Sequence, residues 1–205
     1  MKRSFLSSAA AAGLLVASAV TAQTANAADS IRVRGTIASI SDTALVVKTR
    51  DGTDQSITLK PDWKVSGVTK ASIEDIKPGD YVGIASLPKA QGGDGALEVL
   101  IFPAAMKGTG EGSYAWDLKP NSSMTNATVA DAVQSVEGRT VTVEFQGQEK
   151  KIDIPTATPV VTFAEATKAD LKPGATVFVP SEKAADGTVS TARIVVGTNG
   201  VVPPM

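Results

Sequence analysis

Acidic side chains are the groups whose type and spacing could most readily bind a ligand. Five aspartates lie near predicted turns and offer the oxygen ligands that Ca²⁺ prefers. They are Asp51, Asp54, Asp75, Asp80 and Asp94. Their spacing fits neither an EF-hand loop nor a glycine-rich acidic nonapeptide, and no pair of carboxylates suggests glycoside hydrolysis. Because aspartates in turns commonly bond their own backbone, the sequence favours turn residues over a calcium site.

Nucleophilic catalysis would have to use Ser and Lys. The 205 residues include no Cys and no His, which removes thiol nucleophiles, disulfides, the usual metal ligands and the commonest general base. Neither a Gly-x-Ser-x-Gly elbow nor a Ser-x-x-Lys acylation motif occurs in a suitable context. We therefore predict a protein that is not an enzyme and has no cofactor, with a hydrolase as the least favoured alternative.

Tyr114 and Trp116 are the aromatic residues best placed to bind a partner. They lie in a glycine-containing segment, Pro103 to Ser123, and a plain flexible linker would not carry both. One interpretation is that they hold this linker in place between two domains. The other is an exposed platform for an envelope protein or a glycan, because such residues carry much of the energy at contact sites.

Metal and nucleic-acid binding are weaker possibilities. A Cu(I) site built from Met106, Met124 and Trp116 is chemically possible with soft thioether ligands, and it supports the alternative function of a periplasmic metal-handling accessory protein. Gap-filling is the commoner use of Met, so we predict no metal site. With 20 Lys and Arg against 21 Asp and Glu, the chain also lacks the basic surface of a nucleic-acid-binding protein.

The first 27 residues have the composition of a secretory signal peptide. A basic start is followed by an uncharged, partly apolar stretch over residues 4–20 and by the small-residue triplet Ala25-Asn26-Ala27. We predict cleavage after Ala27, with Ala22 as a second possibility, and a periplasmic or secreted mature protein. The mature chain has no run of about 18 apolar residues, so no membrane span is expected.

An internal repeat organises the rest of the chain. The segment from Val33 to Ile101 aligns with that from Val129 to Val196 at an offset of 96, which becomes 95 after one turn. Apolar positions coincide, and length differences fall only at turns. The predicted domains are a signal peptide at 1–27, one barrel at 28–103, a linker at 104–123, a second barrel at 124–198 and a tail at 199–205.

The sequence of each repeat predicts β structure. Apolar and polar residues alternate with period two in several short runs, and Asp51-Gly52 lies between two of them as a tight hairpin requires. Pro78-Gly79 and Pro173-Gly174 suit turns in which Gly takes a positive φ. Five or six strands with one helical turn in about 70 residues predict two small OB-like β-barrels. Because such domains are marginal alone, we expect the barrels to pack together with Trp116 largely buried.

Several strings resemble an exported bacterial domain family of unknown function. They are Gly35-x-Ile37, Val46 to Gly52, Asp75 to Val82, Leu97 to Val99 with Phe102-Pro103, Gly108 to Gly112, Trp116 to Leu118 and Met124 to Ala127. The resemblance covers the first repeat well, and the linker looks like that of a proteobacterial two-repeat branch. The second repeat keeps the Lys-Pro-Gly turn but has Ala175 where the first has Asp80. Some similar sequences carry the label of a metal-transporter permease, which a mature chain without a predicted span contradicts.

Overall fold

The computed structural model describes residues 28–135 and 138–203, so the predicted signal peptide lies outside the described residues. Strands joined by short loops make up this part of the chain, with three single 3₁₀ turns, η1 (Ile73–Asp75), η2 (Ala104–Met106) and η3 (Lys168–Asp170). The predicted all-β class is confirmed. None of the helical segments described is long and apolar enough to cross a membrane. The strands, in chain order, are β1 (Asp29–Ile40), β2 (Ala44–Thr49), β3 (Asp54–Lys70), β4 (Tyr81–Pro88), β5 (Asp94–Ile101), β6 (Gly112–Ala115), β7 (Ser123–Ser135), β8 (Gly138–Phe145), β9 (Gln148–Pro155), β10 (Val160–Ala164), β11 (Thr176–Lys183) and β12 (Val189–Gly197).

The turns between strands follow from local sequence. Gly79 and Gly174 have φ values of 93° and 86°, the left-handed region that the Pro-Gly pairs require. Before each turn, a 3₁₀ segment is capped by an aspartate that accepts a hydrogen bond from the backbone N–H three residues earlier. Asp75 accepts from Ser72 at 2.8 Å, and Asp170 accepts from Thr167 at 2.7 Å. The predicted single helical turns are therefore present in both halves.

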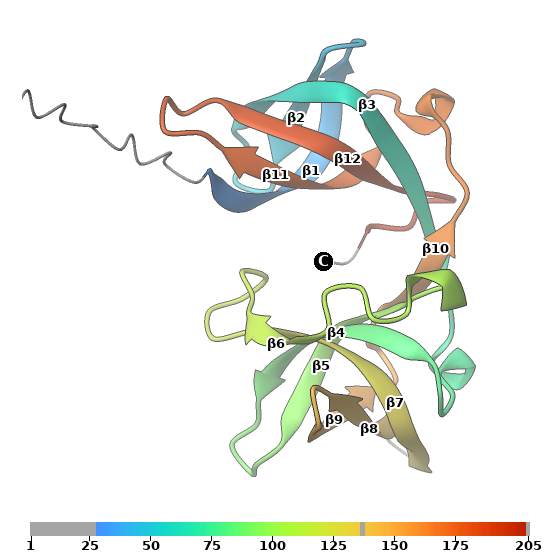
Figure 1. Cartoon of the computed structure of the whole chain (residues 1–205). Helices are drawn as coiled ribbons and strands as arrows, with labels where there is room; N and C mark the ends of the chain where they lie inside the picture. Colours follow the sequence, from blue (N-terminus) through green and yellow to red (C-terminus); the bar gives the residue numbers. More distant parts are fainter. Residues whose placement is uncertain (1–27, 136–137, 204–205) are drawn as a thin grey trace, which may run out of the picture.

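The first barrel is a closed ring of five strands in the order β1-β2-β3-β12-β11 (Figure 1). Strands β3 and β12 run parallel and every other neighbouring pair is antiparallel. Alternate residues point inward, so Leu45, Val47 and Ile57 are completely buried, together with Val179 and Ile194 from the far end of the chain. Closure leaves none of these five strands as a free sheet edge.

The second barrel has the same plan, with the ring order β7-β8-β9-β5-β4. Here β9 and β5 form the parallel pair. Ile84, Val99, Val141 and Ile152 are completely buried in its core. The prediction of small barrels with about five strands is therefore confirmed for both.

The boundaries of the barrels differ from the predicted ones, because neither repeat closes a barrel alone. Residues 29–70 form a barrel with residues 176–197, whereas residues 81–101 form a barrel with residues 123–155. The two halves of the chain thus exchange their last two strands (Figure 1). This corrects the assignment of one barrel to 28–103 and the other to 124–198. The cause is that β3 does not turn back after crossing the first barrel but continues toward the second.

A bridge of two antiparallel segments carries the exchange. Gly67 to Lys70 at the end of β3 pairs with Val161 to Ala164 of β10, and β10 also pairs in parallel with β5. An inter-barrel cluster packs beside this bridge. Its buried members are Val68, Leu100, Val161, Phe178 and Val195, with Phe102, Trp116, Phe163 and Val201 partly buried against them. The barrels therefore form one packed unit, as expected from the small size of each.

Candidate functional site

The linker is fastened to the second barrel by its backbone. Strand β6 adds to the outer side of β7, with Tyr114 opposite Met124. The buried hydroxyl of Tyr81 donates a hydrogen bond to the carbonyl of Thr109 at 3.1 Å, and burial raises the pKa of Tyr81 to about 12. Asn126 donates to the carbonyl of Gly110 at 3.1 Å. The segment between the repeats is thus an ordered part of the structure.

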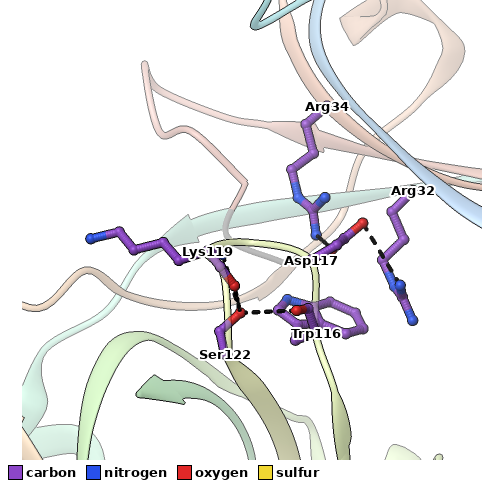
Figure 2. Close-up of polar contacts among 6 residues, drawn as sticks. All are labelled: Arg32, Arg34, Trp116, Asp117, Lys119 and Ser122. Atoms are coloured by element: carbon purple, nitrogen blue, oxygen red, sulfur yellow. Dashed lines mark hydrogen bonds and ion pairs between the residues drawn. The ribbon is translucent and has the colours of Figure 1, made fainter. Parts of the chain in front are cut away.

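Trp116 extends from this linker to the first barrel. The guanidinium carbon of Arg32, on β1, lies 3.9 Å from the centre of the indole ring, and Arg34 lies 5.6 Å from it. Ser122 closes the turn that presents Trp116, because its hydroxyl donates to the Trp116 carbonyl at 3.0 Å (Figure 2). The indole nitrogen is buried and has no hydrogen-bond partner among the described residues. Trp116 is partly rather than fully buried, and it joins the inter-barrel cluster.

Asp117 adds an electrostatic contact beside Trp116. Its carboxylate accepts a hydrogen bond from Arg34 at 2.8 Å and lies 3.7 Å from Arg32 (Figure 2). Burial by itself raises the pKa of Asp117, but the hydrogen bond from Arg34 and the charges of both arginines outweigh it and lower the pKa below its usual value. Asp117 therefore stays ionised at neutral pH and holds the linker against β1.

The two predicted aromatic site residues have different surroundings. Trp116 lies in the contact between the barrels, which matches the interpretation that it fixes the linker. Tyr114 is 40% exposed, with its ring centre 6.0 Å from that of Trp116 and its hydroxyl accepting a hydrogen bond from Asn126. Tyr114 is thus the more exposed of the two predicted site residues.

The aspartates considered for calcium do not converge. Asp51 accepts hydrogen bonds within its own hairpin turn from Thr53, and Asp80 accepts from the backbone N–H of Lys77. Asp75 caps η1, as described above. Among the described residues, no group of three or more Asp, Glu, His or Cys side chains could hold a metal ion. Met124 is buried and Met106 is partly buried, and a thioether site between them stays untested.

Asp94 belongs instead to a polar network at one end of the second barrel. Its carboxylate lies 2.6 Å from the ammonium of Lys150 and accepts a hydrogen bond from buried Ser86 at 2.9 Å. Lys150 also donates to the hydroxyl of Ser123 at 3.2 Å. Lys150 is thus bonded to a carboxylate as well as to the serine hydroxyl. The contact therefore has the geometry of a structural ion pair.

A groove between the two barrels has a volume of about 740 Å³. We call it the inter-barrel groove. The first barrel contributes Arg50, the bridge contributes Lys70 and Val161, and the second barrel contributes the buried carboxylate of Glu98. The C-terminal segment from Val201 to Pro203 forms another wall. A smaller hollow of about 300 Å³ lies beyond this segment, against β1, β2 and β11.

Sequence reasoning missed this groove because its walls come from parts of the chain that lie far apart. Residues near positions 50, 70, 98, 160 and 202 meet only after the strands have been exchanged. The sequence contains only a weak signal for this groove, in the predicted tail. The tail is apolar and contains proline, whereas a disordered tail is usually polar.

Comparison of the chain with models of known protein families, with curated proteins and with solved structures finds no match. The function is therefore argued from the geometry of the groove and of the linker.

Proposed function

We propose that the protein is a non-catalytic binding module of the cell envelope that holds an extended segment of a partner protein in the inter-barrel groove. The export half of this proposal rests on the predicted signal peptide and places the mature chain in the periplasm or outside the cell. The binding half rests on one observation, the groove of about 740 Å³ between the barrels. That volume lies within the usual range of ligand sites.

The chemistry of the groove supports a peptide better than a small polar ligand. Val160 and Val161 are buried apolar residues in its wall, and Ile73 is partly buried beside them. Ser72 and Thr158 bring hydroxyl groups that can bond a peptide backbone. Arg50 and Lys70 are exposed basic residues on the groove, and Glu98 is a buried acidic residue. An extended segment presents apolar side chains together with backbone polar groups, which suits this mixture.

We propose a non-catalytic protein because the Ser–Lys contact in this structure lies away from the groove. The Ser123–Lys150 contact lies in the second barrel, where Lys150 also forms an ion pair with Asp94. Neither Ser123 nor Lys150 lines the groove. Binding therefore needs only the apolar walls and the few polar groups described.

A peptide selection with a matched pair of variants tests the proposal. A random peptide library is selected against residues 28–205 and, in parallel, against residues 28–200, so that the chain's own end does not hide binding. Ala157→Trp fills the groove from an exposed wall position, and Ala185→Trp adds the same side chain at an exposed position in the β11–β12 loop. We expect selected peptides to lose at least about tenfold in affinity with the first variant only, which is about 1.4 kcal/mol.

The affinity is measured by fluorescence anisotropy with labelled peptides. Equal binding to the two tryptophan variants would place the peptide elsewhere and defeat the proposal. A selection that enriches no peptide on either form of the chain would defeat it as well.

A further inference from the structure

The C-terminal segment lies between the barrels and forms one wall of the inter-barrel groove. After β12 the chain turns at Asn199 and Gly200, whose φ values are 54° and 77°, and runs between the two barrels (Figure 1). Val201 packs in the inter-barrel cluster, and Pro203 is buried. Val202 and Pro203 line both the large groove and the smaller hollow beside it. The segment thus lies across the site and separates two hollows from each other.

Few hydrogen bonds hold this segment in place. Thr198 donates to the carbonyl of Val68 through its backbone N–H and its hydroxyl, both at 2.9 Å. Beyond it, Thr176 donates to the carbonyl of Val201 at 3.1 Å. No strand pairing involves residues 198–203. Segments held by few contacts open at low free energy, so this one can leave while the barrels stay folded.

The chemistry of the segment indicates what else the site accepts. Its sequence from Val201 onward is apolar and contains two consecutive prolines. Proline fixes φ, so such a segment is already extended before it binds and loses little conformational entropy. Because the inter-barrel cluster packs against Val201 of this segment, an extended, apolar, proline-containing segment of another protein would meet the same apolar residues once the segment has left.

We propose that the C-terminal segment is an internal competitor: it covers the part of the inter-barrel site that lies between the two hollows until a partner segment displaces it. This inference rests on the proposed function of the groove. A tethered segment has an effective concentration in the millimolar range, so it excludes weak ligands and yields to stronger ones. If the segment covers the site about nine-tenths of the time, the apparent affinity for a partner falls about tenfold.

The test uses a fluorescein-labelled peptide with the sequence of residues 198–205 and measures its binding by anisotropy. The mature chain is compared with residues 28–200 and with two full-length variants. Val201→Asp places a charge in the apolar cluster and should expel the segment. Val133→Asp is the matched control, because Val133 on β7 is 57% exposed and does not line the groove. We expect binding at least about tenfold tighter to residues 28–200 and to the Val201 variant than to the intact chain or the Val133 variant.

The outcomes separate this inference from the proposed function. Equal affinity for all four proteins would overturn internal competition, while library peptides sensitive to Ala157→Trp would still support the groove as a binding site. If no peptide binds any form, the proposed function fails and the inference fails with it. If the circular dichroism of residues 28–200 shows that the truncated protein does not fold, the two full-length variants alone test internal competition.

Discussion

Cutting the linker should leave both pieces of the chain folded and associated. A protease site is inserted between Gly108 and Thr109, in an exposed turn where even an added Cβ at Gly108 would meet no atom within 4 Å. The cut yields one piece with β1 to β5 and another with β6 to β12. If each repeat formed its own barrel, the pieces would fold and separate. Because the strands are exchanged, each barrel instead contains strands from both pieces, and neither piece can close a barrel alone.

The free energy that holds the two pieces together follows from the core residues that they share. Six of the thirteen buried side chains in the first-barrel core belong to the C-terminal piece, among them Leu171, Val179 and Ile194. At about 1.5–3 kcal/mol for each buried side chain, separating the pieces forfeits on the order of 10 kcal/mol in this barrel alone. The cut replaces an effective concentration of about 1 mM by a free concentration of about 10 μM, which costs only about 2.7 kcal/mol.

Size-exclusion chromatography with light scattering measures the result on the uncut and cut forms of the same inserted chain. We expect one particle of unchanged mass, unchanged β circular dichroism, and a melting temperature that becomes dependent on concentration after the cut. Two species of about half the mass that both retain β structure would show that each repeat closes its own barrel, and the strand exchange would be refuted.

Four further predictions concern the linker, a turn and metals. Because the pKa of Asp117 is lowered in the folded state, its contribution to stability is present above the unfolded value of about 3.9 and is lost as pH falls through the folded value. The difference in unfolding free energy between the wild type and Asp117→Asn should therefore shrink below about pH 4, and a pH-independent difference would contradict this. Trp116→Ala should destabilise the chain by about 1–3 kcal/mol in denaturant titrations, because Trp116 contacts Arg32 and the inter-barrel cluster, whereas exposed Tyr114→Ala should change stability much less. Gly79→Val should cost about 1–3 kcal/mol from backbone strain at a φ of 93°, and an unchanged midpoint would show that the turn adapts. Isothermal titration with Zn²⁺ or Cu²⁺ should give no sub-micromolar site, because imidazole and thiolate ligands are absent from the sequence.

Local features were predictable from the sequence because they depend on neighbouring residues. The positive φ at Gly79 and Gly174 follows from a preceding proline. The buried faces of strands such as Ala44–Thr49 follow from alternation, with Leu45 and Val47 buried between less buried neighbours. The order of strands and 3₁₀ turns within each repeat follows from the same signals.

Pairing between distant strands was not predictable, because two repeats with the same apolar pattern offer each strand two equivalent partners. The alternation that buries Val177 and Val179 of β11 would fit the core of either barrel. The path of β3 determines which barrel β11 joins. The contact between Asp94 and Lys150 joins residues from different repeats and has no local signature. The same is true of Trp116 with Arg32. What was missed is therefore long-range pairing and the groove that it creates.

The strand exchange also constrains how this chain can change during evolution. In a protein made of independent domains, recombination between two repeats yields pieces that fold, and either copy can be lost or duplicated without harm to the other. Here a breakpoint after residue 103 leaves two incomplete barrels on each side, because residues 176–197 complete the first barrel and residues 81–101 complete the second. A destabilising substitution in either half of the chain should therefore affect both barrels.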